Sequence, residues 1–172
     1  MSGLFQGRTI RLYHFTDTRN LPSIRAQGGI LSMAELKRLG VDIAAPGGNE
    51  LSFWADKKNN MDHYVHLCLD DEHPMEWTAR QAGRISQSIF LEISPLILES
   101  SGVLFSPAVA NKTDAVFYKV SDCEGMIDHE VLYTKMDWTV PAIKERLMAA
   151  RKCEVLVPAR VPMQFIKNLP NG

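Results

Sequence analysis

The chain has 172 residues, of which 45% are hydrophobic and 23% are charged, and a globular chain of this length predicts a single domain over 1–172. The formal net charge of −1 argues against a generally basic nucleic-acid-binding protein, but it is compatible with a local basic groove. No apolar run approaches ~18 residues, and neither a secretory signal nor a C-x-x-C pair is present, so we expect a cytoplasmic protein with reduced thiols and no membrane partner.

The first part of the chain predicts a strand followed by two short helices. Thr9 to Phe15 alternates between apolar and polar positions, which is typical of a strand. Asn20 as a helix cap, Pro22 in a first turn and Gly28 as a stop predict the first helix. The segment from Ser32 to Leu39, followed by a glycine, predicts the second.

The remainder predicts short strands with unevenly inserted helices. A segment rich in glycine, asparagine and charge over 45–60 indicates a loop. Helices are expected over 75–83 and 141–152. Strands are expected over 64–69, 88–93, 116–120, 153–157 and 163–166. This pattern predicts an α+β fold with a twisted, mainly antiparallel sheet flanked by short helices.

His14 is the first candidate for a functional site. A lone histidine on the apolar face of a strand is often a hydrogen-bonded core residue, and that interpretation stays open. Thr16 and Asn20, however, offer donors and acceptors where the strand ends. The Gly28-Gly29 pair beyond them would permit close approach of the backbone to a ligand.

Glu154 is the second candidate. It stands at the start of an apolar strand, directly after a helix end that carries Arg151 and Lys152. An exposed edge carboxylate is the simpler interpretation. The functional one is electrostatic, because a fixed carboxylate can hold a ribose hydroxyl and stabilise an oxocarbenium-like transition state.

The segment from Asp62 to Met75 holds three histidines and several carboxylates, a composition that invites a metal site. His63 and His66 would face opposite sides of a strand, and no H-E-x-x-H or C-x-x-C motif is present. We therefore expect no metal. Cys68 and Cys153 lie in apolar strands and are expected to be buried thiols rather than nucleophiles.

These motifs resemble the DarT family, the toxin ADP-ribosyltransferases of bacterial toxin–antitoxin systems that modify bases in DNA. Besides Gly83-Arg84-Ile85 with 90–93, which is similar to a further strand of the family, three parts of the sequence carry the resemblance. One is similar to the family's first NAD-binding motif, one to its central strand and turn, and one to the segment with its catalytic glutamate. They are Tyr13-His14-Phe15-Thr16 with 20–24 and 28–32, Tyr64-Val65-His66-Leu67 with 73–75, and Cys153-Glu154-Val155-Leu156-Val157-Pro158.

The resemblance implies an ADP-ribosyltransferase-like fold, NAD as co-substrate and Glu154 as the catalytic residue. It further implies a nucleobase in DNA as acceptor, within a toxin–antitoxin or anti-phage system that includes a cognate antitoxin protein. A single-stranded DNA or RNA partner is favoured because an exposed base avoids the cost of unstacking. The residues implied in NAD binding are His14, Thr16, Asn20, Arg25, Gly29, Leu31 and Tyr64.

The sequence also departs from the family pattern. Family members carry an arginine in the turn after the central strand, where this chain has Asp70-Asp71-Glu72-His73. Guanine in DNA, thymine in DNA and adenine in RNA therefore all stay open as acceptors. The segment 122–138 is expected to be a loop that presents the substrate, and Arg151 and Lys152 to form part of a basic track.

Alternatives of other classes also stay open. An RNA-base or protein ADP-ribosyltransferase and an RNA 2′-phosphotransferase-like enzyme would share the opening motif. A catalytically silent module that binds NAD or nucleic acid would share the fold. Retained activity without Glu154 would favour the phosphotransferase, and unchanged NAD with every nucleic acid would favour the silent module.

Overall fold

A six-stranded sheet forms the centre of the computed structural model, which describes residues 4–42, 60–110 and 114–171. Its ladders are antiparallel, and β2 (Gly29–Leu31) and β8 (Arg160–Pro162) form a second antiparallel sheet. The predicted α+β fold with a mainly antiparallel sheet is confirmed. The order across the larger sheet is β4 (Ser88–Ile93), β1 (Leu12–Asp17), β3 (Tyr64–Cys68), β7 (Glu154–Pro158), β5 (Leu104–Ser106) and β6 (Tyr118–Lys119).

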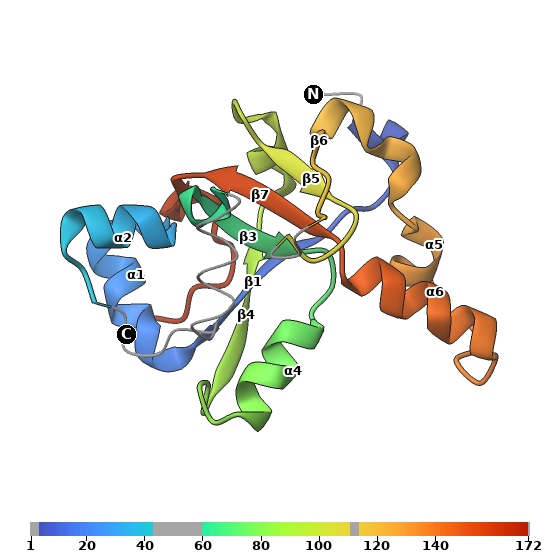
Figure 1. The fold of residues 1–172 in the computed structure, drawn as a ribbon, viewed down its shortest axis with the longest axis horizontal. Coiled ribbons are helices and arrows are strands. Elements are labelled where there is room, and N and C mark those ends of the chain that lie inside the picture. Colours follow the sequence, from blue (N-terminus) through green and yellow to red (C-terminus); the bar gives the residue numbers. More distant parts are fainter. Residues whose placement is uncertain (1–3, 43–59, 111–113, 172) are drawn as a thin grey trace.

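Short helices surround this sheet, with α1 and α2 at one end of the molecule, α5 and α6 at the other, and α4 below (Figure 1). None of the helices within the described ranges is long and apolar enough to cross a membrane. The α-helices are α1 (Leu21–Gln27), α2 (Met33–Leu39), α4 (Pro74–Gln81), α5 (His129–Tyr133) and α6 (Pro141–Arg151). The 3-10 helices are η1 (Leu4–Gly7), η2 (Thr18–Asn20), η3 (Met61–His63), η4 (Pro95–Glu99), η5 (Val120–Asp122), η6 (Glu124–Met126) and η7 (Met163–Phe165).

The two N-terminal helices begin and end at the residues that the sequence predicts. Helix α1 follows Asn20 and ends at Gly28, whose φ of 71° lies in the left-handed region that glycine tolerates. Ser32 caps α2, because its side chain accepts a hydrogen bond from the backbone N–H of Glu35, and Gly40 ends it. Local capping chemistry therefore fixes both ends of α2 and the C-terminal end of α1.

Other predictions need correction. The expected strand over 163–166 is wrong: 163–165 is a 3-10 helix, and Ile166 forms only an isolated bridge with Ile93. The strand lies earlier, at β8, because Ala159 adopts a left-handed φ of 62° and turns the chain from β7 into the second sheet. The expected loop over 122–138 is also wrong in part, since it contains η6 and α5. The loop predicted over 45–60 falls almost wholly outside the described residues.

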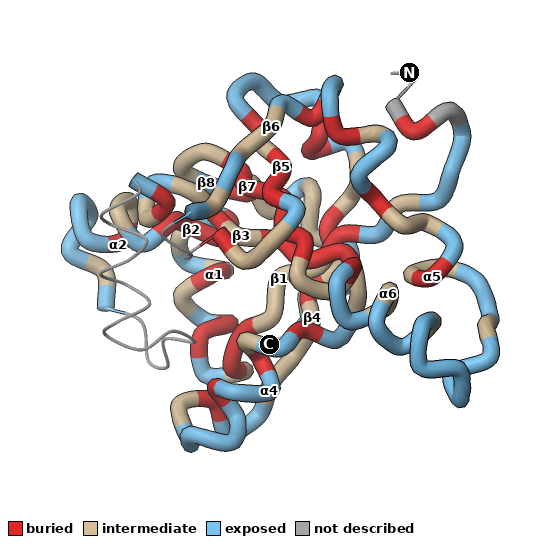
Figure 2. The backbone as a smooth tube through the Cα atoms, turned by 45° about the vertical axis from the view of Figure 1, so that its right-hand side comes forward, coloured by how far each residue is buried: buried red, intermediate tan, exposed pale blue. Residues whose placement is uncertain are grey.

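The buried residues concentrate in the central sheet (Figure 2). Strand β7 is enclosed on both faces: Val155 and Val157 belong to the main apolar core, whereas Leu156 belongs to a second cluster with Met61 and Ala110. Burial on both sides explains why this strand reads as a continuous apolar run instead of alternating. Glu154 begins this strand, so it starts inside the protein and not at an exposed edge.

Candidate active site

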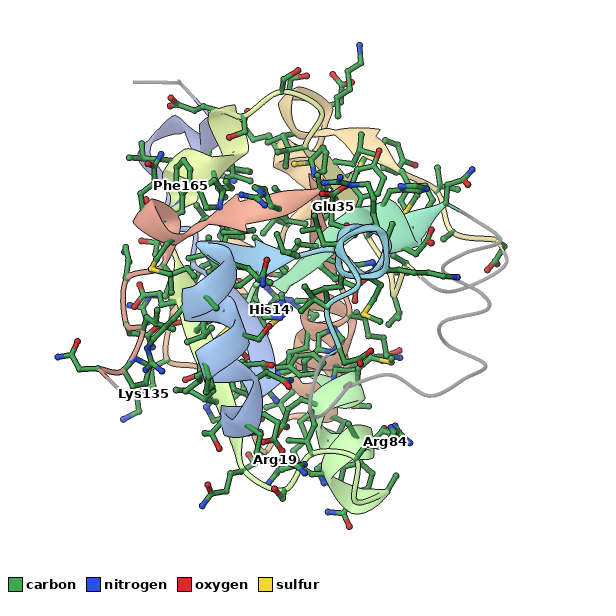
Figure 3. The ribbon with its side chains drawn as sticks, turned by 90° about the vertical axis from the view of Figure 1, so that its left-hand side faces the viewer. His14, Arg19, Glu35, Arg84, Lys135 and Phe165 are labelled. Carbon is green, nitrogen blue, oxygen red and sulfur yellow. The ribbon has the colours of Figure 1, made fainter. Side chains whose placement is uncertain are left out.

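Strands β1 and β3 separate along most of their length. Strand β1 pairs with β4 at all six of its residues, but it pairs with β3 only at Tyr13 and Cys68. Past that position the side chain of His14 spans the gap, because its Nδ1 lies 3.1 Å from the carbonyl oxygen of His66. Figure 3 shows His14 in the middle of the molecule, whereas the labelled Arg19, Arg84 and Lys135 lie at its periphery.

The contact with a carbonyl oxygen fixes the tautomer of His14. Since a carbonyl only accepts, Nδ1–H of His14 is the donor, and Nε2 is left with a lone pair. Burial lowers the pKa of His14 to about 4, although the same backbone hydrogen bond acts in the opposite direction. The ring is therefore neutral at physiological pH and presents Nε2 as an acceptor, the polarity that a ribose hydroxyl requires.

Thr16 and Asn20 connect the end of β1 to the start of α1. Both side chains are buried, and Nδ2 of Asn20 donates to Oγ1 of Thr16 over 3.0 Å. Asn20 stands at the predicted cap position, but its side chain makes no capping hydrogen bond. The polar groups that the sequence places around His14 are thus gathered at one end of β1.

Glu154 lies one strand further across the sheet. Glu154 and Cys68 are directly opposite each other in the β3–β7 ladder, and Cys68 is opposite Tyr13, so these side chains share one face of the sheet. His14, the next residue along β1, projects from the other face. The structure therefore places the two principal candidates on opposite faces, with the separation of β1 and β3 between them.

The carboxylate of Glu154 is enclosed by donors. Its side chain is 8% exposed, and Oε2 accepts a hydrogen bond of 2.8 Å from the backbone N–H of Ala110. Nδ1 of His66 lies 3.5 Å from the same oxygen, and Nε2 of His73 lies 3.7 Å from Oε1. No lysine or arginine contacts it in the described part of the chain.

Two opposing effects set the pKa of Glu154. Burial raises it, whereas the hydrogen bond from His66, the charges of His66 and His73, and the N–H of Ala110 lower it, and the net pKa is below the usual value. Glu154 is therefore ionised at neutral pH despite its burial. An enclosed carboxylate of this kind can stabilise positive charge that develops on a sugar ring, because little water is present to screen it.

His66 and His73 are site residues that the sequence did not predict at Glu154. The available signal was their position in the segment that resembles the family's central strand and turn. Within the described residues, no group of three or more His, Cys, Asp or Glu side chains is arranged to hold a metal ion. Cys68 and Cys153 are buried thiols, as predicted, and burial raises the pKa of each.

The other residues expected to bind NAD already have partners within the protein. Arg25 donates to the carbonyl oxygen of Pro170 in the C-terminal tail. Gly29 and Leu31 belong to β2, and a Cβ on Gly29 would lie 2.2 Å from the carbonyl oxygen of Val161. The close approach predicted at this glycine is therefore to strand β8.

Tyr64 stands at the start of β3 and packs against the second apolar cluster. Pro158 is its partner in the β3–β7 ladder, at the opposite end from Glu154. The structure therefore does not bring Tyr64 together with Glu154, although both belong to the same pair of strands.

A cavity of about 580 Å³ lies between α4, β4 and the end of α6. His73, Trp77 and Lys152 line it, and Trp77 is 58% exposed. Arg151 also lines it, but its guanidinium is held by Asp70 at 2.7 Å and by Glu72 at 2.9 Å. Of the two cations expected in a basic track, Arg151 is thus already neutralised within the protein.

The structure combines a separated pair of central strands, a neutral histidine beside the gap and a buried carboxylate at the start of the neighbouring strand. These features fit the class that the sequence predicts, the ADP-ribosyltransferases. A family model described as "ssDNA thymidine ADP-ribosyltransferase, DarT" matches residues 13–169. The chain belongs to the DarT family. It is an NAD-dependent ADP-ribosyltransferase that acts on DNA, with NAD as the co-substrate, as the sequence predicts.

Solved structures show the same fold. Thermus sp. 2.9 DarT in complex with ADP-ribosylated ssDNA matches with a TM-score of 0.65 and 17% identity over 91% of this chain and 78% of that one. The complex of the same Thermus protein with NAD+ matches with a TM-score of 0.63 and 16% identity, over 91% of this chain and 79% of that one. Thermosipho africanus DarTG in complex with ADP-ribose matches with a TM-score of 0.65 and 18% identity over 92% of this chain, which spans only 43% of that protein. No significant match was found among curated proteins.

Proposed function

We propose that this chain transfers one ADP-ribose from NAD to a thymine base of single-stranded DNA, with Glu154 as the catalytic carboxylate. The observation that supports this most directly is the state of Glu154: buried, ionised, and held without a lysine or arginine in the described part of the chain. A carboxylate neutralised by a full ion pair would be less able to stabilise positive charge on a substrate. The family description names thymidine in ssDNA as the acceptor.

In the proposed reaction the protein forms no covalent bond with the substrates; Glu154 acts through its charge and its position. As the bond between nicotinamide and ribose breaks, positive charge develops at the anomeric carbon, and the carboxylate of Glu154 stabilises it electrostatically. A ring nitrogen of the base then attacks that carbon, a new N–C bond replaces the bond to nicotinamide, and the proton of that nitrogen passes to solvent water. Nicotinamide is the leaving group. Glu154 also accepts a hydrogen bond from a ribose hydroxyl and so orients the sugar.

NAD lies where β1 and β3 separate. His14 accepts a hydrogen bond from NAD through Nε2, and the Thr16–Asn20 pair closes that end of the site. The other expected residues surround the NAD site without contacting NAD directly. Arg25 contacts the C-terminal tail, and Gly29 and Leu31 pair with β8. Tyr64 lies at the start of β3. This division of roles follows from the partners that each residue already has.

Single-stranded DNA is the preferred form of the acceptor. A base within a duplex must first leave the stack, which costs a few kcal/mol, whereas an unpaired base avoids most of that cost. Thermus sp. 2.9 DarT has been seen with an ADP-ribosylated single strand. We therefore expect about 100-fold faster modification of a single strand than of its duplex, which is the rate equivalent of about 3 kcal/mol.

The biological role proposed is that of a cytoplasmic toxin whose activity is neutralised by an antitoxin encoded alongside it. Unregulated modification of DNA bases would block the use of DNA as a template. The fold is shared with Thermosipho africanus DarTG, a chain more than twice as long as the part matched here. An antitoxin partner that suppresses growth arrest on co-expression would support this role.

The deciding experiment is mass spectrometry of single-stranded DNA and RNA oligonucleotides incubated with NAD and either the wild type or Glu154→Gln. Glutamine preserves the size of the side chain but removes its charge, so we expect at least a 100-fold loss of transfer. A mass gain of ADP-ribose on thymine-containing DNA that is absent with the variant supports the proposal.

Other outcomes would favour the alternatives. Modification of RNA alone would move the acceptor to RNA, and NAD consumed without a modified oligonucleotide would indicate a protein acceptor. Activity retained by the variant would favour an RNA 2′-phosphotransferase-like enzyme. Intact NAD under every condition would indicate a silent binding module.

A further inference from the structure

Of the two ring nitrogens of His73, one accepts a hydrogen bond and the other makes none among the described residues. It caps helix α4, because its Nδ1 accepts a hydrogen bond of 3.1 Å from the backbone N–H of Met75. An accepting Nδ1 carries no proton, so in the neutral ring the proton is on Nε2. That nitrogen is buried and makes no hydrogen bond with any residue that the structure describes. The residue is 3% exposed and its ring stacks on Phe15 at 5.7 Å.

The unpartnered Nε2–H is directed at the catalytic carboxylate. Oε1 of Glu154 lies 3.7 Å away, which is beyond a hydrogen bond but within a small side-chain adjustment of one. Buried donors without acceptors are rare in folded proteins because each one is destabilising. Catalytic hydrogen bonds are often long in the free enzyme and shorten when substrate is present. Glu154 is therefore the acceptor that Nε2–H of His73 faces.

The second oxygen of this carboxylate already has its donors. Oε2 accepts from Ala110, and Nδ1 of His66 faces it at 3.5 Å. The other ring nitrogen of His66, Nε2, lies 3.0 Å from the carbonyl oxygen of Met61. His66 is therefore held between two acceptors, the carboxylate of Glu154 and the carbonyl oxygen of Met61. Oε1, by contrast, faces only His73 among the described residues.

We propose that His73 is a positioning residue for Glu154, donating from Nε2 to Oε1 while His66 and Ala110 hold Oε2. This inference rests on the proposed function, in which Glu154 is the catalytic carboxylate. As a consequence, both carboxylate oxygens of Glu154 are held in position before substrate binds, so the negative charge is already oriented toward the ribose. The sequence turn that supplies His73 is the one that departs from the family pattern.

Two substitutions separate positioning from folding. His73→Asn retains an acceptor at the cap of α4 but is too short to reach Glu154. His73→Gln places an amide N–H near the position of Nε2 but is a poorer helix cap. A purely structural role predicts that the asparagine variant is the better of the two in both Tm and activity. Positioning predicts the opposite order in activity: kcat falls about 10- to 100-fold for His73→Asn and less for His73→Gln.

The pH profile gives a second readout. Glu154 is faced by His66, His73, Cys68 and Cys153, and loss of the His73 donor removes one stabiliser of its ionised form. The acid limb of kcat should therefore move to higher pH in His73→Asn and stay nearer the wild-type position in His73→Gln.

The measurement is ADP-ribosylation of a thymine-containing single strand by the full chain, with Tm determined in parallel and Glu154→Gln as the reference. Wild-type kcat and acid limb in His73→Asn, or greater activity in His73→Asn than in His73→Gln, would overturn the positioning role. If the wild type itself does not modify DNA, or if Glu154→Gln is fully active, the proposed function fails first. The two failures are therefore distinguishable.

Discussion

His14 and Glu154 show how the surroundings of a side chain decide its charge. His14 is half-buried, and its removal from water outweighs the hydrogen bond with the carbonyl oxygen of His66, so its pKa falls. Glu154 is more completely buried, but donors surround its carboxylate and outweigh the cost of burial. Burial therefore leaves His14 neutral, whereas Glu154 stays charged. A neutral His14 suits an acceptor of a hydrogen bond from NAD, and a charged Glu154 suits a stabiliser of positive charge.

The lowered pKa of His14 predicts pH-dependent stability. Because its pKa is about 4 in the folded state and 6.5 in the reference state, the unfolded chain binds the proton more readily. The stabilisation is complete above pH ~6.5 and is lost as the pH falls toward 4, by up to about 3 kcal/mol. His14→Asn retains a short N–H donor without titrating, so its free energy of unfolding should fall less over that range.

Denaturant unfolding of both proteins at pH 7, 5.5 and 4.5 measures the difference. Other groups that titrate in this range are common to the two proteins and cancel in the comparison. An identical pH dependence of stability for wild type and variant would contradict the half-buried, neutral state of His14.

The pairing of β2 with β8 shows why a glycine is needed at one element boundary. Gly28 ends α1 with a left-handed φ, and Gly29 continues with a φ of 154° into a strand that lies directly against β8. No space is present for a side chain at Gly29, since a Cβ would meet the backbone of Val161. The second sheet therefore depends on this residue for close packing of its two strands.

Gly29→Ala should destabilise the protein by about 3 kcal/mol or more, because the strand pair must separate or the backbone must shift. Gly40→Ala is the matched control. Its φ of 66° is also left-handed, but no atom lies within 4 Å of a Cβ there, so only the conformational cost of about 1 kcal/mol applies. Thermal unfolding of both variants tests this, and equal losses would contradict the steric account.

Across the whole molecule, many basic side chains are neutralised by nearby acids. Ion pairs join Arg19 to Asp17, Arg38 to Glu35, Arg80 to Glu76, Arg146 to Asp128 and Glu130, Arg151 to Asp70 and Glu72, and Lys167 to Glu92. The formal net charge is −1. Attraction of a DNA strand must therefore come from a few local cations and not from the overall field. That 1–172 folds as one domain stays a prediction.

Lys152 and Arg151 should consequently behave differently when each is replaced by glutamine. Lys152→Gln should weaken binding of a single strand and make the slope of log affinity against log salt shallower by about 0.7, the value for one lost phosphate contact. Arg151→Gln should lower stability by about 1–2 kcal/mol, because it leaves Asp70 and Glu72 without their partner. Binding titrations at several salt concentrations and denaturant unfolding give the two readouts. A larger salt effect for Arg151→Gln would contradict this assignment.

The sequence by itself determined those features that depend on neighbouring residues. The ends of α1 and α2 follow from caps and glycines within a few positions, and β4 and most of β7 follow from apolar runs with clear limits. The family resemblance and the choice of Glu154 also came from short motifs read along the chain.

Only the tertiary structure decided which groups surround Glu154. His66, His73 and Ala110 are separated from it by 88, 81 and 44 residues of chain (154 − 66, 154 − 73 and 154 − 110), and they meet it through the register of β3 against β7 and the turn before α4. Likewise, Arg25 and Gly29 looked like ligand contacts until the C-terminal tail and β8 were seen against them. Local sequence governs where elements begin and end, whereas long-range strand pairing governs which side chains share a site and which donors a buried charge receives.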